Sequence, residues 1–256
     1  MELKQHWNEN SISVNEVFGP TIQGEGVDVG KSCFFLRLHH CPVKCPGCDT
    51  SYTWNGTEDP TRMKFSDLMK QFASLHQLAP GAGVVVSGGE PLLLYRNENW
   101  YNFMSWVRQT FPWCSLETSG FVSPKPIDGS ELATFLWRFT TVHLSPKITP
   151  CLHGEGWTDE ELLVNVPSFM RCFADKPSKL IFKFVVRDDI DVAAVEQVVE
   201  RFRVRAAGFP VYLMPYGLER DEIIESCIRL APHLARTGFI LSPRLHSILW
   251  GKQRGV

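Results

Sequence analysis

Three cysteines lie within eight residues of this chain, in the segment Cys41-Pro-Val-Lys-Cys45-Pro-Gly-Cys48. Three thiolates this close cannot all pair with one another in disulfide bonds, but they can bind a soft metal centre. A closed structural zinc site needs four ligands, whereas three protein ligands leave one coordination position open. Iron–sulfur clusters usually take four cysteines. The spacing therefore indicates either a cluster with one iron free to bind a small molecule or a zinc site whose fourth ligand lies elsewhere.

Polar, glycine- or serine-bearing turns follow several apolar segments, and in parallel α/β sheets such turns at strand ends carry the ligand site. Each turn alone is equally well explained as an ordinary chain reversal. Their combination with a three-thiolate loop favours a ligand site, in which Gly88-Gly89-Glu90 offers backbone carbonyls and an acid to an amine. The four turns are Ser87–Pro91, Glu117–Gly120, Ser145–Lys147 and Met214–Gly217.

Two further features could contact a ligand. The segment Gly19–Gly26 does not match the glycine patterns of dinucleotide- or phosphate-binding loops. It is either a turn between two strands or a loop that approaches a ligand closely, with Gln23 and Glu25 as polar contacts. Arg37 interrupts the apolar run Cys33–Leu38, which is typical of a strand buried on both faces. A buried arginine needs a partner, so Arg37 forms either an internal ion pair or a bidentate clamp on a ligand carboxylate.

The elements that would position these residues alternate between short apolar segments and amphipathic patterns of helical period. This alternation predicts an α/β fold with a mostly parallel sheet. We expect one domain over residues 1–256, an open partial (β/α) barrel whose polar turns gather at one end. We expect residues 1–13 to be a loose lead-in and residues 242–256 to be a tail that docks near the site. Helical patterns occur at 65–78, 103–111, 132–139, 192–202 and 220–235, with a possible helix near 159–165.

The composition narrows the class of protein. The chain has 256 residues, of which 44% are hydrophobic, enough for a sizeable core. Its formal net charge of −2 does not favour a nucleic-acid partner. No apolar run approaches the length of a membrane span. Eight cysteines without a secretory signal are typical of reduced thiols and metal ligands, so we expect a cytoplasmic protein.

Several motifs resemble a known enzyme family. The cysteine spacing and Gly88-Gly89-Glu90-Pro91 resemble the cluster and cofactor motifs of radical S-adenosylmethionine (SAM) enzymes. Other motifs resemble 7-carboxy-7-deazaguanine synthases, and together they extend over nearly the whole chain. These motifs are Thr21–Gly26, Cys48-Asp49-Thr50, Glu117–Gly120, Ser145–Lys147 and the C-terminal pattern from Arg244 to Val256. Gly47 departs from the resemblance, because many members have an aromatic residue before the third cysteine.

The resemblance implies a radical SAM lyase. In that family a [4Fe–4S] cluster reduces SAM, and the resulting 5′-deoxyadenosyl radical removes hydrogen from C6 of 6-carboxy-5,6,7,8-tetrahydropterin. The ring contracts with loss of ammonia to give 7-carboxy-7-deazaguanine, a precursor of queuosine, and Mg²⁺ assists the rearrangement. It also implies an electron donor such as flavodoxin or ferredoxin, and a homodimer. No catalytic side chain is implied beyond the radical that the cofactor supplies.

The resemblance also assigns expected roles to individual residues. Cys41, Cys45 and Cys48 would hold the cluster, and Thr50 would bind Mg²⁺. The expected cofactor contacts are Gly88, Gly89, Glu90, Glu117, Ser145, Pro146, Lys147, Met214, Pro215, Tyr216 and Gly217. The expected substrate contacts are Ile22, Gln23, Gly24, Glu25, Arg37, Ser87 and the terminal carboxylate of Val256.

Two other interpretations remain at this point. A glycyl-radical activating enzyme shares the cysteine spacing and Gly-Gly-Glu-Pro, but it does not account for the Gln23–Glu25 loop or the C-terminal motif. A zinc-binding interaction module would need a fourth ligand, for which His39 and His40 are candidates. A polar strand end is the simpler explanation for these two histidines.

Overall fold

The computed structural model describes residues 7–8, 10–148 and 157–256. A ten-stranded sheet has the order β1-β2-β3-β5-β6-β7-β8-β9-β10, with β4 beside β2. All neighbours from β3 to β10 are parallel, and β2 is antiparallel to β1, β3 and β4. The strands are Trp7–Asn8 (β1), Ser11–Ile22 (β2), Ser32–Leu38 (β3), Thr61–Lys64 (β4), Gly83–Gly88 (β5), Cys114–Thr118 (β6), Thr141–Leu144 (β7), Leu180–Val186 (β8), Val211–Pro215 (β9) and Ile240–Leu241 (β10).

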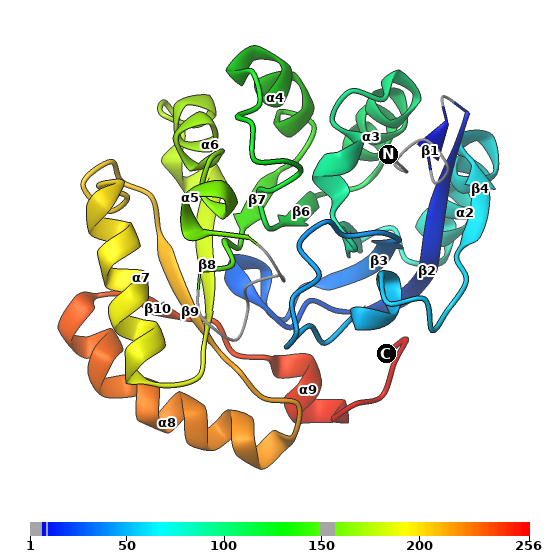
Figure 1. The fold of residues 1–256 in the computed structure, drawn as a ribbon. Coiled ribbons are helices and arrows are strands. Elements are labelled where there is room, and N and C mark those ends of the chain that lie inside the picture. The colour runs from blue at the N-terminus through cyan, green and yellow to red at the C-terminus, as the bar shows by residue number, and fades with distance from the viewer. Residues whose placement is uncertain (1–6, 9, 149–156) are drawn as a thin grey trace.

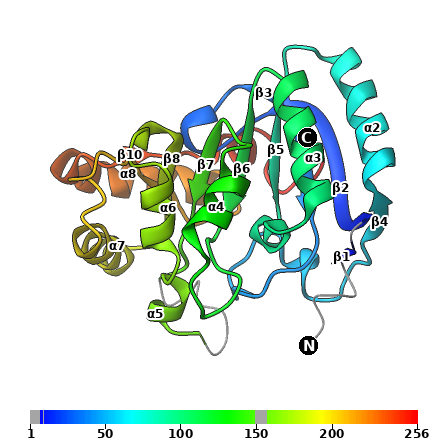
Figure 2. The ribbon, with the colours of Figure 1, turned by 90° about the horizontal axis from the view of Figure 1, so that it is seen from above.

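The sheet curves into a half-barrel, with helices around its outer side (Figure 1). Figure 2 shows the strands following one another across the molecule from β10 to β2. Within the described residues, β10 pairs with β9 and not with β1 or β4, so the half-barrel is open. The predicted mostly parallel α/β partial barrel is therefore confirmed.

Capping residues mark the ends of several helices. At the start of α3, the side chain of Asn97 accepts a hydrogen bond from Trp100 N. The side chain of Asp188 likewise accepts backbone N–H hydrogen bonds at the start of α7. Gly238 ends α8 in the left-handed conformation. The α-helices are Phe65–Leu78 (α2), Glu98–Thr110 (α3), Gly129–Leu136 (α4), Asp159–Leu162 (α5), Val166–Cys172 (α6), Asp189–Arg201 (α7), Arg220–Thr237 (α8) and Leu245–Trp250 (α9). Short 3₁₀ helices occur at Gly26–Asp28 (η1), Ser51–Thr53 (η2), Pro91–Leu94 (η3) and Pro177–Lys179 (η4). No helix among these is both long and apolar enough to cross a bilayer.

Strand alternation separates the apolar core from a polar interior. Successive side chains of a strand point to opposite faces. On β8, Phe182 and Phe184 belong to the core beneath the helices, whereas Lys183 and Val185 line the pocket inside the half-barrel. The same alternation on the neighbouring strands directs polar side chains inward, so the concave face can hold a charged ligand.

Some local expectations were wrong. The loose lead-in does not extend to residue 13, because Ser11–Val14 already pair with β4 as part of β2. Residues 1–6 and 9 of that expected lead-in lie outside the described residues. The chain does not turn at Gly19 either: β2 continues to Ile22, with an irregularity in its pairing to β3 between Phe18 and Thr21. The possible helix near 159–165 ends at Leu162, and α6 follows it directly.

Phe72 tests the contribution of the aromatic core between α2 and α3. Its ring is fully buried and lies edge-on to Phe103 and Phe111, with centroid distances of 5.7 Å and 6.0 Å. Phe72→Ala should lower the free energy of unfolding by about 3–5 kcal/mol, because it removes a large apolar group and leaves a cavity. Leu78→Ala, on the same helix but 67% exposed, should change it by less than about 0.5 kcal/mol. Urea denaturation of both variants measures the difference, and equal effects would contradict this account of the core.

Candidate active site

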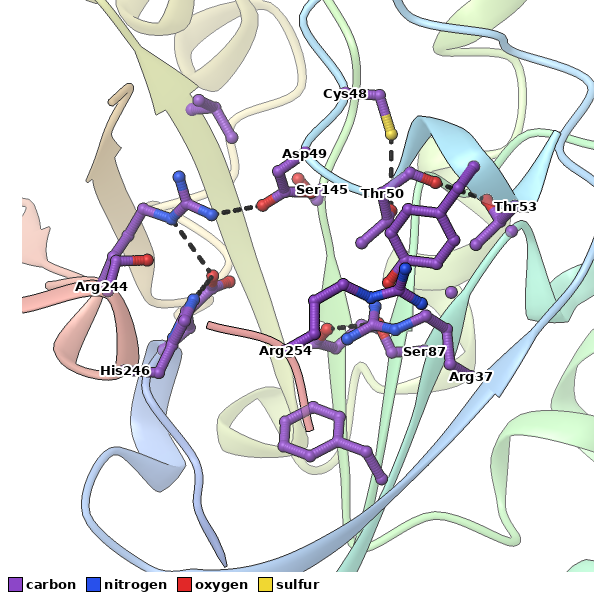
Figure 3. Close-up of a pocket in the computed structure, with 18 of the residues that line it drawn as sticks. Arg37, Cys48, Asp49, Thr50, Thr53, Ser87, Ser145, Arg244, His246 and Arg254 are labelled. Carbon is purple, nitrogen blue, oxygen red and sulfur yellow. Dashed lines mark hydrogen bonds and ion pairs between the residues drawn. The ribbon is translucent and has the colours of Figure 1, made fainter. Parts of the chain in front are cut away.

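A cavity of about 490 Å³ lies within the half-barrel, where the parallel strands end. Figure 3 shows ten of its lining residues by name, drawn from β3, β5, the cysteine loop and the C-terminal segment. Most of the residues expected to bind cluster, cofactor or substrate line it. These are Ile22, Gln23, Glu25, Arg37, Cys41, Cys45, Cys48, Thr50, Ser87, Gly88, Gly89, Glu90, Glu117, Ser145, Lys147, Met214, Tyr216 and Val256. Gly24, Pro146, Pro215 and Gly217 are not among the lining residues.

The three cysteines of the Cys41–Cys48 loop are free thiols that face this cavity. The loop reverses sharply, with Lys44 at φ 51°, and Trp157 supports it by donating a hydrogen bond of 3.1 Å to Pro42 O. Among the described residues, no three His, Cys, Asp or Glu side chains converge as ligands of a single metal ion would. A [4Fe–4S] cluster does not need such convergence, because each thiolate binds a different iron. The loop therefore offers three thiols to a soft metal centre at the wall of the cavity.

The glycine pair Gly88-Gly89, at the end of β5, lies against the start of the cysteine loop. Gly88 has φ +91°, and a Cβ atom there would lie 2.3 Å from Arg37 Cγ. A Cβ atom on Gly89 would lie 2.0 Å from His40 O. Only glycine fits at such contacts, so this pair brings the β5 turn against the cysteine loop whether or not it also contacts a ligand.

Glu90, next to this pair, is buried and joins the ends of two strands. Its carboxylate accepts hydrogen bonds from Leu92 N at 2.9 Å and from Ser119 N at 2.8 Å. Thr118 Oγ1 and Ser119 Oγ also donate to it. Burial raises the pKa of Glu90 above its ordinary value, although these hydrogen bonds oppose the shift. Glu90 therefore fixes the β5 and β6 turns relative to each other at the wall of the cavity.

Arg37 forms an internal ion pair, which is one of the two interpretations of a buried arginine. Its Nε donates to Glu16 Oε1 at 2.6 Å, and both side chains are mostly buried. The guanidinium also lies over the rings of Phe18 and Phe35, 5.8 Å and 5.9 Å from their centroids. Because the residue lines the cavity, it can hold an internal ion pair through Nε and still face a ligand.

Two carboxylates and a buried lysine occupy the inner wall of the cavity. Lys183 Nζ lies 2.5 Å from Glu25 Oε2 and 3.7 Å from Glu117 Oε1. Glu117 also accepts hydrogen bonds from Gln23 Nε2 at 3.0 Å and from Ser87 Oγ at 2.7 Å. Lys183 therefore links the loop after β2 to the strands β6 and β8.

The charges in this group stabilise one another. Burial would raise the pKa of Glu25, but Lys183, His246 and Arg244 together hold that pKa below its ordinary value. Burial would lower the pKa of Lys183, but Glu117 and Glu25 hold it above its ordinary value. Glu25 and Lys183 are therefore ionised at neutral pH despite their burial.

The C-terminal segment completes the floor of the cavity. Gly26 N donates to Ser242 Oγ at 2.8 Å, and Leu245 N donates to Gly24 O at 2.9 Å. A Cβ atom on Gly24 would lie 2.1 Å from the His246 ring, so this glycine allows the two segments to pack although it does not line the cavity. The expected docking of the tail near the site agrees with these contacts.

Sequence reasoning missed several residues of the cavity. No role was predicted for Lys183, because it lies in an apolar strand. A lysine between two phenylalanines on a buried strand nevertheless indicates a charge that faces inward. Glu16 contacts both Arg37 and Tyr52, but nothing in their spacing indicates these contacts. Arg244 donates to Gly217 O and to Asp49 (Figure 3). Arg244 belongs to the C-terminal motif that runs to Val256, but no role was expected for it.

The buried charge group predicts a pH-dependent stability. Lys183→Met should lower the free energy of unfolding at about pH 7 by about 3–5 kcal/mol, because it leaves buried carboxylates without their closest cation. Stabilisation from ionised Glu25 is complete above about pH 4.3, the ordinary glutamate pKa. It is lost as the pH falls through the lower folded-state pKa. The loss of stability between about pH 7 and about pH 2 should therefore be smaller in the variant, because the closest cation that lowers the pKa of Glu25 is absent, as measured by urea denaturation.

Lys70→Met is a matched control for that change of charge. Lys70 lies 3.4 Å from Asp67, and both side chains are mostly exposed. Its replacement should change the stability by less than about 0.5 kcal/mol at either pH. If Lys183→Met behaved like this control, the buried group would not stabilise the fold as described.

Comparison with known proteins identifies relatives along the chain. A family model described as a 4Fe-4S single cluster domain matches residues 22–125. A 7-carboxy-7-deazaguanine synthase from Pyrobaculum aerophilum is 32% identical over 247 residues, which cover 95% of this chain and 97% of the relative. The enzyme of the same name from Bacillus subtilis is 26% identical over 262 residues, covering 96% of this chain and 98% of the relative.

Solved structures show the same fold. The crystal structure of QueE from Escherichia coli matches with a TM-score of 0.62 and 23% identity, covering 94% of this chain and 97% of that one. The structure of anSMEcpe with bound AdoMet matches with a TM-score of 0.53 and 20% identity, covering 84% of this chain and 62% of that one. The three-cysteine loop thus lies in a fold shared with an AdoMet-binding protein. With a relative more than 30% identical along almost its entire length, the chain belongs to the 7-carboxy-7-deazaguanine synthase family.

Proposed function

We propose that this protein converts 6-carboxy-5,6,7,8-tetrahydropterin into 7-carboxy-7-deazaguanine with loss of ammonia, as a radical SAM lyase in 7-deazapurine (queuosine) biosynthesis. One observation carries the proposal. A single cavity is lined both by the three free thiols and by Gln23, Glu25, Arg37 and Glu117. A redox cofactor and a polar, carboxylate-bearing substrate can therefore meet inside it.

The cysteine side of the cavity suits the cofactors. Cys41, Cys45 and Cys48 would hold a [4Fe–4S] cluster and leave one iron for SAM. Bound there, cluster and SAM supply a 5′-deoxyadenosyl radical that removes hydrogen from C6 of the substrate. The protein's part is to orient both reactants and exclude water. Cofactor contacts would come from Gly88, Gly89, Glu90, Ser145, Lys147, Met214 and Tyr216 at the cavity wall, and from the backbone of Pro146, Pro215 and Gly217 in the same turns.

The polar residues of the lining suit a pterin. The ring edge of a pterin presents N–H donors beside a carbonyl acceptor, which carboxylate and amide side chains can match. Gln23, Glu25 and Ser87 would contact this edge, with Ile22 lining the cavity beside them and Gly24 giving the loop its shape. Glu117 belongs with this group rather than with the cofactor, because its partners are Gln23, Ser87 and Lys183.

Arg37 would bind the carboxylate of the substrate. It lines the cavity as a guanidinium whose Nε is already held by Glu16, and arginine binds carboxylates through paired hydrogen bonds. The terminal carboxylate of Val256, which also lines the cavity, would contact the pterin from the tail.

Thr50 would contribute its hydroxyl to Mg²⁺. A hard cation prefers oxygen ligands and takes few of them from the protein. Thr50 lines the cavity next to the third cysteine, with its Oγ1 3.5 Å from Cys48 Sγ. Substrate oxygens and water would complete the coordination. This placement favours a metal bound together with the substrate.

The remaining interpretations find less support. A zinc module would use His39, but His39 Nδ1 lies 2.9 Å from Asn15 Oδ1. The carbonyl of His40 accepts from Glu90 N, consistent with a strand end. A glycyl-radical activating enzyme has no use for an acidic group deep in the cavity. We further propose a cytoplasmic homodimer that receives electrons from flavodoxin or ferredoxin, as the family resemblance implies.

An anaerobic turnover assay tests the proposal. Protein reconstituted with iron and sulfide, then given SAM, reductant, Mg²⁺ and 6-carboxytetrahydropterin, should release 7-carboxy-7-deazaguanine, detected by its mass. Cys45→Ala should lose both product and cluster absorbance, because two thiolates cannot hold the cluster. Cys227→Ala, on α8 outside the cavity, should keep both. Formation of 5′-deoxyadenosine without product would move the substrate elsewhere, and a colourless protein would favour the zinc module.

Extension of the tail tests the role of Val256. A short Gly-Ser extension after Val256 should reduce turnover by about a hundredfold, because it replaces the terminal carboxylate and displaces groups next to the substrate. Cluster absorbance should be unchanged. The same extension at the N-terminus serves as the control. Full activity of the extended protein would contradict a contact between the tail and the pterin.

A further inference from the structure

Glu16 contacts three residues of the cavity that come from distant parts of the chain. It lies on β2, in register with Arg37 on β3. Its Oε1 accepts hydrogen bonds from Arg37 Nε at 2.6 Å and from Tyr52 Oη at 2.9 Å. Its Oε2 lies 3.6 Å from a terminal nitrogen of Arg254. One carboxylate therefore connects the expected substrate clamp to the C-terminal tail.

The contact through Nε determines which edge of Arg37 is available. Charge-assisted hydrogen bonds of this kind are short and directional. In the described part of the chain, Glu16 is the hydrogen-bond acceptor of this guanidinium. The stacked rings of Phe18 and Phe35, with centroids 4.9 Å apart, restrict its position further. The two terminal nitrogens are left for a carboxylate in the cavity.

Arg254 brings the tail to the same carboxylate. Its guanidinium lies 3.8 Å from the centroid of the Tyr52 ring and pairs with Glu58 at 2.5 Å and 3.3 Å. Figure 3 shows the side chains of Arg37 and Arg254 approaching each other within the cavity. Arg254 precedes Val256 by two residues, so its position limits where the terminal carboxylate can lie.

We propose that Glu16 is a positioning residue that orients Arg37 and the C-terminal tail together for a carboxylate-bearing pterin. This inference rests on the proposed function and adds to it a residue that does not itself touch the substrate. Glu16 orients the guanidinium of Arg37 through Oε1 and attracts Arg254 of the tail through Oε2. Glu58 holds Arg254 but neither Arg37 nor Tyr52, so it provides a matched control.

The test measures the preference for a substrate carboxylate. Wild type, Glu16→Leu, Glu16→Gln and Glu58→Leu are loaded with cluster and SAM. Each is titrated calorimetrically with 6-carboxypterin, the oxidised and unreactive form, and with pterin lacking the carboxylate. The dissociation constant for pterin divided by that for 6-carboxypterin reports the contact between Arg37 and the carboxylate, whatever the effect of each variant on general affinity.

Glu16→Leu should lower this ratio about tenfold, because it frees Arg37 to turn away from the carboxylate. Glu16→Gln should stay within about threefold of the wild type, since its amide oxygen still accepts from Nε. Glu58→Leu should keep the ratio. Both leucine variants should lose their C-terminal residues to carboxypeptidase faster than the wild type. Cluster content and SAM affinity check the fold, and if Glu16→Leu fails that check, Glu16→Ala takes its place.

The outcomes separate the two proposals. If the wild type bound neither pterin, the substrate assignment and the role of Glu16 would both be overturned. If the wild type preferred 6-carboxypterin and Glu16→Leu kept that preference, the role of Glu16 alone would be overturned. Equal losses in Glu16→Leu and Glu16→Gln would also overturn it, because charge rather than orientation would then explain the effect.

Discussion

The cavity depends on the ion pair between Lys183 and Glu25. It places a lysine, buried on a central strand, against a carboxylate carried by the loop after β2. Separating such charges inside a protein is costly, so the pair holds the loop within the half-barrel. Gln23 reaches Glu117 because the loop lies there, and Ser87 on β5 donates to the same carboxylate. The polar groups of the inner wall therefore act as one unit whose geometry exists before a ligand binds.

An open half-barrel suits this arrangement. A closed barrel of eight strands would fill its interior with its own side chains, whereas this open sheet encloses a cavity of about 490 Å³. The sheet therefore does not form the whole wall of the cavity. The cysteine loop covers one side, and the segment from Ser242 to Val256 covers the other. Loop and tail are therefore as much a part of the active site as the strands.

The sequence allowed much of this to be predicted. Helical periodicity indicated α2, α3, α7 and α8, and strand-end turns indicated the residues that now line the cavity. Contacts that depend on strand register could not be foreseen. Glu16 faces Arg37 because β2 pairs antiparallel with β3 at that register, which no local pattern specifies. Alternation along β8 places Lys183 opposite to Phe182 and Phe184, but the alternation alone does not say which face of the sheet is concave.

The floor of the cavity joins Gly26 to Ser242, residues that are 216 positions apart. A chain leaves the ribosome with its N-terminus first, and its segments fold as they emerge. The cysteine loop and the β5 turn can therefore meet while the floor is still absent. The wall made by the cysteine loop and the β5 turn can therefore form before the floor does, and it gains that floor only when the segment from Ser242 onward packs against Gly24 and Gly26.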